Sequence, residues 1–187
     1  MPPKARITRE QILDAAFEMA RYQGADRINA RSLSKALGCS TQPVLYHFQT
    51  MEEIRQAVYE RADRYHSDYI SHISGENPML EIGLNYIRFA AEEKHLFALL
   101  FQSGSFSGLE LQKLMEGEAL QPILQIFSQE AELSMEKTRR LFRILFLTVH
   151  GYAGMYGGND MVFEEAKISE DLQLVYQGCM EKMRGED

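Results

Sequence analysis

Residues 37–48, Leu-Gly-Cys-Ser-Thr-Gln-Pro-Val-Leu-Tyr-His-Phe, decide how the chain is expected to fold. Gly38 can end a helix in a tight turn, because glycine adopts a positive φ at little cost. Ser40 can then cap a new helix, and Pro43 falls in the first turn of that helix, where a missing N–H does no harm. The stretch therefore predicts a short helix from Ser40 to about Phe48 that directly follows another helix.

The residues before this stretch predict a supporting helix. Thr8 and Gln11 have the spacing of a capping box, which predicts a helix that starts at Thr8 and ends at Gly24. Its apolar residues recur at helical spacing and would form one buried face. That face consists of Ile12, Leu13, Ala16, Phe17 and Ala20.

A second, short helix is predicted over residues 30–37, with Asn29 as a possible cap and with Leu33, Ala36 and Leu37 pointing inward. Two short helices joined by a tight turn and packed on a preceding helix make a helix-turn-helix arrangement. The alternative is an ordinary helical hairpin whose polar residues are merely solvated.

The rest of the chain is also expected to be helical, because it shows helical spacing of apolar residues and no strand-type alternation. Residues 103–107 and 157–160 are rich in glycine and predict loops. The chain is thus expected to be an all-α protein of about nine helices, with a three-helix head and a larger helical body. The further helices are predicted over residues 50–73, 78–93, 95–103, 108–128, 135–156 and 166–183.

Composition limits the class of protein. The 187 residues are 45% hydrophobic and 25% charged, enough to bury a core and to stay in solution. The longest apolar stretches are too short to span a bilayer, and the N-terminus lacks the apolar core of a signal peptide, so we expect a cytoplasmic protein. Cys39 and Cys179 fit a reducing compartment and are expected to be small buried residues.

The charge is unevenly distributed. Residues 1–50 hold seven basic and four acidic groups, a net charge of +3, whereas the whole chain has a net charge of −7. The remainder is therefore strongly acidic. Such asymmetry indicates an end that faces nucleic acid on an acidic body, although random scatter of surface charge would look the same.

The predicted second helix of the pair would enter the major groove of DNA, with its N-terminal residues nearest the bases. Short polar groups at a positive helix end suit phosphates and base edges, and flanking aromatic or basic groups can reach the phosphate backbone. The residues predicted to bind DNA are Arg31, Ser40, Thr41, Gln42, Pro43, Tyr46 and His47.

Residues 37–48 resemble the recognition segment of the TetR family of transcriptional regulators. Residues 12–16, Gly24, residues 33–37 and residues 52–54 resemble the segments around it, so the resemblance covers about residues 7–58. Many members of that family have tyrosine where Leu45 stands and lysine where Met51 stands, so Tyr46 or Gln49 would have to make those phosphate contacts. Residues 83–90 followed by Leu96 and Phe97 more weakly resemble the family's ligand-binding domain.

The resemblance implies a helix-turn-helix DNA-binding domain over residues 1–50 and a ligand-binding and dimerisation domain over residues 51–187. It also implies a homodimer formed by the last two helices, at about 135–156 and 166–183. Each has an apolar stripe that could enter a four-helix bundle or could simply cover the subunit's own core. The stripes are Leu141, Leu145, Thr148, Val149, Tyr152 and Met155 on the first helix, and Ile168, Leu172, Val175, Tyr176, Cys179 and Met183 on the second.

The resemblance further implies a small-molecule pocket in the body. Large aromatic and flexible side chains line such sites, although they also fill cores. His150, on an otherwise apolar helix face, is the polar residue of most interest, with a buried and satisfied histidine as the alternative. The pocket candidates are Phe89, Phe97, Phe101, Met115, Phe127, His150, Tyr152 and Tyr156.

Two other functions compete with a DNA-binding regulator. Glu92 and His95 have the Glu-x-x-His spacing of di-iron helix bundles, but such sites need two of these motifs and further glutamates, so we expect no enzyme, metal site or cofactor. A fold-retaining adaptor that binds no DNA would have no need of a polar, helix-capped head. We expect instead a ligand-responsive regulator, most simply a repressor, that binds a near-palindromic operator as a dimer and is released by a small molecule. The effector, the operator, the regulated genes and the choice between repression and activation stay open.

Overall fold

The computed structural model of the chain describes residues 7–75, 77–104, 110, 113 and 117–185. These residues form nine α-helices and two short 3-10 helices, with no strand among them, so the predicted all-α fold is confirmed. They fall into two compact units. Of the described residues, the first unit comprises 7–67 and 93–104, and the second comprises 68–75, 77–92, 110, 113 and 117–185.

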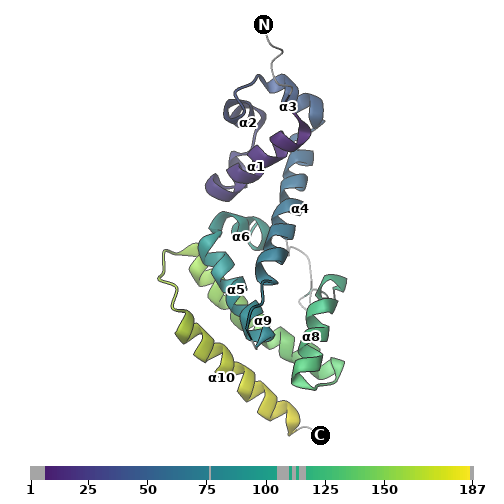
Figure 1. Cartoon of the computed structure of the whole chain (residues 1–187), viewed down its shortest axis with the longest axis vertical. Coiled ribbons are helices and arrows are strands. Elements are labelled where there is room, and N and C mark those ends of the chain that lie inside the picture. Colours follow the sequence, from purple (N-terminus) through teal and green to yellow (C-terminus); the bar gives the residue numbers. More distant parts are fainter. Residues whose placement is uncertain (1–6, 76, 105–109, 111–112, 114–116, 186–187) are drawn as a thin grey trace. The chain divides into compact units, whose positions relative to one another are not determined.

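The first unit contains the predicted helix-turn-helix head together with two further helices (Figure 1). Residues 7–50 of the segment predicted to bind DNA lie within it, and residues 1–6 lie outside the described residues. α1 contacts α2, α3 and α6, so it is the central helix of this unit. The helices of the first unit are α1 (Arg9–Gln23), α2 (Ala30–Ala36), α3 (Thr41–His47), α4 (Met51–Ile70) as far as residue 67, and α6 (Lys94–Phe101), with a 3-10 turn at Ala25–Arg27.

α1 begins and ends as the sequence predicts. The Thr8 hydroxyl accepts a hydrogen bond from the Gln11 backbone N–H at 3.2 Å, and the Gln11 side chain accepts one from the Thr8 N–H at 3.0 Å. This reciprocal capping box satisfies donors that would otherwise be free at the start of the helix. Gly24 ends the helix at a φ of 93°. The buried face is the predicted one with one addition, and comprises Ile12, Leu13, Ala16, Phe17, Met19 and Ala20.

The second unit is built around the contact between α5 and α9, the most extensive of its helix pairs (Figure 1). α8 and α10 also pack on α9, and α10 packs on α5. The Asn77 side chain caps α5 by accepting a hydrogen bond from the Leu80 N–H at 3.1 Å. The helices of the second unit are α5 (Pro78–Glu92), α8 (Gln121–Ala131), α9 (Met135–Gly158) and α10 (Glu165–Arg184), with a 3-10 helix at Glu118–Leu120 and the last turn of α4.

Several predicted helix boundaries are wrong. α4 ends at Ile70, not near residue 73. The helix predicted over residues 108–128 is not continuous, because Gly117 is non-helical and α8 starts only at Gln121; part of that range lies outside the described residues. α9 continues through Gly158, beyond the predicted end at residue 156, because a glycine alone does not stop a helix. The Asn159 side chain then donates to the Met155 carbonyl at 2.8 Å, at the end of the helix.

Three predicted burials are also wrong. Ala36 is exposed, since it lies on the side of the short helix α2 that faces away from α1 and α3. Cys39 and Cys179 are free thiols that are half-buried and not fully enclosed.

None of the described helices is long and apolar enough to cross a bilayer.

Candidate functional site

The turn between α2 and α3 is held by local hydrogen bonds. At the start of α2, the Asn29 side chain accepts from the Ser32 N–H at 2.9 Å and the Ser32 hydroxyl accepts from the Asn29 N–H at 3.1 Å, a second capping box. At the other end Gly38 has a φ of 62°, and the Cys39 N–H donates to the Ser34 carbonyl at 2.9 Å. The positive φ at Gly38 reverses the chain and starts α3 three residues later.

α3 exposes most of its surface. Val44 is its fully buried residue, and Phe48, directly after the helix, is also completely buried. Thr41, Gln42 and Tyr46 are exposed, and Tyr46 is 71% accessible. Two apolar anchors at one side thus hold a seven-residue helix whose other sides face solvent.

Ser40 occupies the N-cap position of α3, but its side chain makes no capping hydrogen bond. The N-terminal end of α3 therefore has exposed hydroxyl and amide groups beside backbone N–H groups that the helix itself does not use. Such an end favours an anionic group, because the helix dipole is positive there.

The C-terminal end of α3 is fixed by contacts that sequence reasoning missed. The Arg9 guanidinium lies 4.5 Å from the centroid of the Phe48 ring, and Arg9 also pairs with Glu53 at 3.7 Å. The His47 Nε2 atom lies 2.9 Å from the Ile7 carbonyl oxygen. No spacing rule links residues about 40 positions apart, so only the fold could reveal these contacts.

The residues predicted to bind DNA gather on α2 and α3. Arg31, in the first turn of α2, is exposed. Pro43 and His47 are half-buried, and the contact of His47 with Ile7 gives this side chain a structural role as well. The exposed members of the set are Arg31, Ser40, Thr41, Gln42 and Tyr46.

A buried ion pair ties α1 to the start of α6. The Arg21 Nε atom donates to both Glu93 oxygens, at 3.0 and 2.8 Å, and the Tyr65 hydroxyl of α4 donates to Glu93 at 3.1 Å. The hydrogen bond with Glu93 raises the pKa of Arg21 above its ordinary value. The Glu93 side chain is only 9% exposed, so loss of either partner would leave a poorly solvated charge unpaired.

The same contact bears on the metal-site alternative. The backbone leaves the helical conformation at Glu93, so Glu92 ends α5 whereas His95 lies in α6. The Glu-x-x-His spacing therefore does not place the two side chains on one helix face. Within the described residues, no group of three or more His, Cys, Asp or Glu side chains could hold a metal ion.

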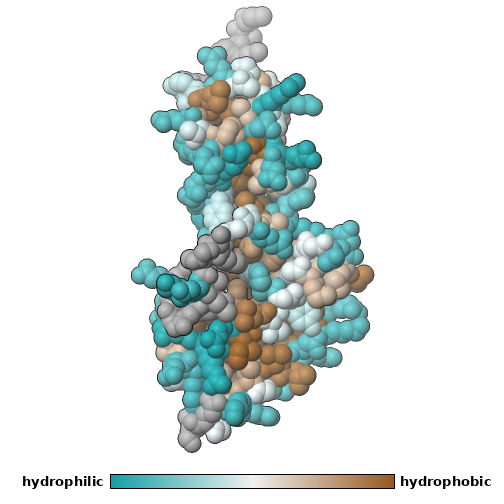
Figure 2. Space-filling model, turned by 180° about the vertical axis from the view of Figure 1, so that it is seen from behind, coloured by the Kyte–Doolittle hydropathy of each residue, from teal (hydrophilic) through white to brown (hydrophobic). Residues whose placement is uncertain are grey.

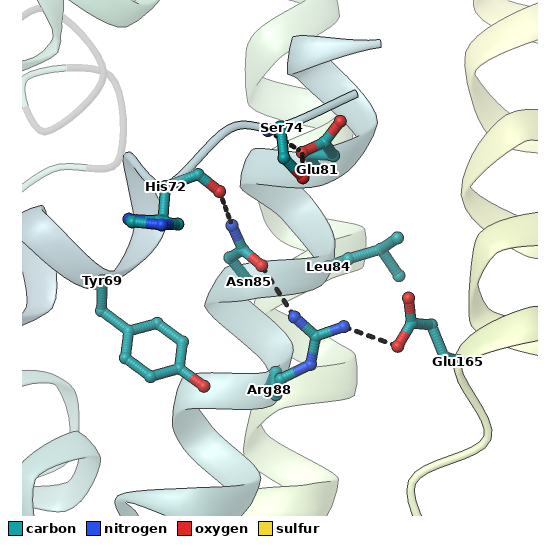
Figure 3. A pocket seen from close by; sticks show the side chains of 8 residues that line it. All are labelled: Tyr69, His72, Ser74, Glu81, Leu84, Asn85, Arg88 and Glu165. Atoms are coloured by element: carbon teal, nitrogen blue, oxygen red, sulfur yellow. Dashed lines mark hydrogen bonds and ion pairs between the residues drawn. The ribbon is translucent and has the colours of Figure 1, made fainter. Parts of the chain in front are cut away.

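The second unit has a pocket of about 490 Å³ beside α5 (Figure 3). Figure 3 shows Arg88 between Asn85 and Glu165, with Glu81 beside Ser74 at the far end. The pocket is lined by Tyr69, His72, Ser74, Glu81, Leu84, Asn85, Arg88 and Glu165.

None of the residues predicted to line a pocket lines this one. Phe97 and Phe101 belong to the first unit, where their ring centroids are 5.1 Å apart. Met115 lies outside the described residues. In the second unit Phe89, Phe127 and Tyr156 are buried in the core.

His150 and Tyr152 have polar partners in the second unit. The His150 Nδ1 atom lies 3.0 Å from the Tyr86 hydroxyl, and its ring stacks on Phe146 with centroids 5.5 Å apart. Burial lowers the pKa of His150 and raises that of Tyr86. The Tyr152 hydroxyl donates to Asp171, which raises the pKa of Tyr152 to about 12. His150 is thus half-buried, with a polar partner in Tyr86.

The apolar stripes predicted for dimerisation mostly face the unit's own core. Leu141, Leu145 and Val149 of α9 are buried there, and so are Ile168 and Leu172 of α10. The large apolar residues of these helices that remain exposed are Leu147 and Met155 on α9 and Leu174 on α10. Hydrophobic surface is visible on this unit in Figure 2.

Sequence comparison finds relatives among regulators. No family model matches the chain. An uncharacterized HTH-type transcriptional regulator of Bacillus subtilis, YobS, is 27% identical over 97 residues, which are 49% of this chain and 50% of that protein. The class D tetracycline repressor protein of Escherichia coli is 34% identical over 74 residues, 39% of this chain and 34% of that protein. The chain thus spans half of the first relative and about a third of the second.

Structural comparison covers nearly the whole chain. A crystal structure of a transcriptional regulator from Rhodococcus has a TM-score of 0.69 and covers 94% of this chain and 97% of its own, at 17% identity. That likeness establishes a shared fold. The local sequence relatives and the shared fold agree with the resemblance to TetR-like regulators seen in residues 7–58.

Proposed function

We propose that the protein is a transcriptional regulator that binds duplex DNA through α3. The observation that carries this proposal is the exposure of α3: a helix anchored by Val44 and Phe48 leaves Thr41, Gln42 and Tyr46 in solvent. A helix held in this way fits the major groove, which admits one α-helix.

The roles of the side chains follow from their chemistry. Gln42, in the first turn of α3, has an amide that can bond both the N6 and N7 atoms of adenine. Ser40 and Thr41 can donate to a phosphate next to the free N–H groups of the helix end. Arg31 can neutralise a second phosphate. Base contacts would supply sequence preference, and the phosphate contacts would supply affinity and register.

A dimer is the form in which such a head gains specificity, because two heads contact two half-sites. The exposed faces of α9 and α10 support this part of the proposal. Leu147, Gly151 and Met155 recur every four residues along α9, and Leu174 and Gly178 do so along α10. Apart from the backbone and chain neighbours of its own helix, no atom of the described residues lies within 4 Å of a Cβ placed at Gly151 or Gly178, so a second helix can approach closely there. Leu174, 69% exposed, would be buried by that approach.

Control by a small molecule is the remaining part of the proposal, and the names of the tetracycline repressors support it. A ligand that favours a state with wrongly spaced heads would release DNA, and DNA would oppose the ligand through the same coupling free energy. The full proposal is a homodimeric, ligand-released repressor of a near-palindromic operator.

The test starts with selection of bound duplexes from random DNA by the full chain after dialysis. We expect enrichment of a two-fold related sequence and a dimer in sedimentation. Gln42→Ala should then weaken binding to the selected duplex more than binding to a scrambled one, whereas Arg31→Ala should weaken both about equally. Gln173→Ala, an exposed glutamine on α10, serves as the matched control and should change neither.

The outcomes that would contradict the proposal are specific. No preference among duplex sequences at any salt concentration would indicate an adaptor that keeps the fold without binding DNA. A stable monomer would remove the basis for a palindromic site. Equal losses from Gln42→Ala on both duplexes would remove the assigned base contact.

A further inference from the structure

The pocket of the second unit is built on one face of α5. Glu81, Leu84, Asn85 and Arg88 follow each other at helical spacing and all line it. A volume of about 490 Å³ is within the range of sites for small organic ligands. All of its lining residues except Leu84 carry a polar group, in contrast to the apolar core on the other faces of the same helix.

Arg88 is held in place from inside the unit. The side-chain carbonyl oxygen of Asn85 accepts a hydrogen bond from Arg88 Nη1 at 2.9 Å. The side-chain amide of Asn85 donates to the backbone carbonyl of His72, also at 2.9 Å. Asn85 is only 8% exposed, so its orientation is fixed by these partners. The ring of Phe163 lies 5.6 Å from the guanidinium carbon. The guanidinium is thus oriented before any ligand arrives (Figure 3).

The outer side of the guanidinium is occupied by a carboxylate of the chain itself. Arg88 Nη2 donates to Glu165 Oε2 at 2.5 Å. Glu165 is the first residue of α10, and its side chain is 53% exposed. An ion pair this exposed contributes little to stability, because water competes for both groups. Glu165 can therefore leave Arg88 at small cost.

We propose that the pocket binds a small organic monocarboxylate, whose carboxylate replaces that of Glu165 on Arg88. This inference rests on the proposed function, in which the body takes a small-molecule effector. The planar fork of an arginine matches a carboxylate with two parallel hydrogen bonds, so the fixed guanidinium is the anion-binding group. The Tyr69 ring and Leu84 provide the apolar contact for the rest of the molecule.

The charges of the lining favour a monocarboxylate over other ligands. Arg88 is the single Arg or Lys among the eight lining residues. When Glu165 turns to solvent, the carboxylate of the ligand takes its place, and the net charge beside Arg88 is unchanged. A dianion such as a phosphate monoester would add a second negative charge to a pocket that already holds the Glu81 carboxylate, and like charges repel.

The pocket is less suited to a cationic ligand, because both carboxylates that line it already have partners. The Glu81 carboxylate already accepts from the Ser74 N–H at 2.7 Å and from the Gly75 N–H at 2.6 Å. Glu165 is already paired with Arg88. Binding of a monocarboxylate would also free the first residue of α10, a helix that the proposed dimer uses, so the ligand would act on that helix directly.

The test uses the full chain after dialysis, with hexanoate, benzoate and phenylacetate as probes and their primary amides as uncharged counterparts. Binding is measured by saturation-transfer NMR and by titration calorimetry at millimolar ligand. We expect at least one carboxylate to bind about tenfold more tightly than its amide. Arg88→Met should abolish that binding, and Glu165→Gln should strengthen it several-fold by removing the resident competitor.

Arg143→Met, which removes an exposed arginine of α9, is the matched control and should leave binding unchanged. Circular dichroism shows whether each variant is folded, and Arg88→Lys, which keeps the charge but loses the fork, should bind more weakly than the native chain. Failure of every carboxylate to bind, equal binding of acids and amides, or weaker binding in Glu165→Gln would overturn the inference. If the chain still selects one duplex sequence, the ligand class alone is wrong; carboxylate binding without DNA selectivity would refute the proposed function instead.

Discussion

The two compact units hold their helices together by different means. In the first unit, polar groups connect helices that are far apart in sequence: Arg21 and Tyr65 meet Glu93, and Arg61 meets Asp14 at 2.5 Å. In the second unit, aromatic and aliphatic side chains from α8, α9 and α10 form one continuous apolar cluster. Both units bury apolar side chains, and Phe48 and Phe97 of the first unit are almost fully enclosed, so the contrast is that the first unit adds the poorly solvated Arg21–Glu93 pair to its core.

The apolar cluster should give the largest single-residue effect. Phe127 of α8 is buried and meets the Phe142 ring at a centroid distance of 5.4 Å, nearly edge to face. Phe127→Ala should lower the free energy of unfolding by about 3–5 kcal/mol, because a large cavity replaces the ring. Urea unfolding followed by circular dichroism measures the loss. Val162→Ala, at an exposed loop position, is the control and should stay within about 0.5 kcal/mol of the native chain.

The ion pair of the first unit should give the next largest effect. Glu93→Gln removes the charge with little change of shape and should cost about 3 kcal/mol, because Arg21 is left without its counter-ion. The double variant Arg21→Met with Glu93→Gln should recover part of this loss, since no unpaired charge remains. Asp14→Asn, in the more exposed pair with Arg61, should cost only about 0.5 kcal/mol. Equal losses in the two pairs would show that burial does not set their strength.

Acid should affect the first unit through His66. This residue is buried on α4, its ring lies 5.0 Å from that of Phe101, and burial lowers its pKa to about 4. The unfolded chain binds a proton near pH 6.5, so stability is full above that pH and falls as the pH drops towards 4. Between pH 7 and pH 5 this group should remove about 2 kcal/mol.

His66→Leu should abolish that part of the pH dependence, which urea titrations at several pH values would reveal. The carboxylates that protonate in the same range are common to both chains, so only the difference between them reports on His66. His72→Ala, an exposed histidine of the second unit, should leave the profile unchanged. A parallel pair of profiles for native and His66→Leu chains would contradict the burial argument.

The sequence predicted the local features of the first unit and missed the distant contacts of both units. The capping box at Thr8, the cap at Asn29 and the turn at Gly38 follow from residues within a few positions of each other, and the structure contains all three. The exposed end of α3 follows from the same short-range signals. The contact of Arg88 with Glu165 joins residues 77 positions apart, which no local pattern can indicate.

The pocket was missed for a further reason. Aromatic residues such as Phe89 and Phe127 were expected to line it, but large apolar groups give the greatest gain in free energy when fully buried, so they fill the core. Polar groups such as Asn85 then remain to line a hollow at the edge of the core. Helix α5 presents both kinds of residue, and only packing against α9 decides which face is buried.

The smallest effect on stability comes from two residues of the head, one of which we expect to serve folding and the other DNA binding. Thr8 and Ser40 both stand at N-cap positions, but only Thr8 uses its hydroxyl to cap a helix. Thr8→Ala should therefore cost about 1 kcal/mol of unfolding free energy, and Ser40→Ala less than about 0.5 kcal/mol. In fluorescence anisotropy with the selected duplex, Ser40→Ala should weaken DNA binding more than Thr8→Ala does. The Ser40 hydroxyl is left available for a phosphate, whereas Thr8 acts only through α1. If Ser40→Ala destabilised the chain as much as Thr8→Ala does, the hydroxyl would be capping α3 and could not also be the group that meets DNA.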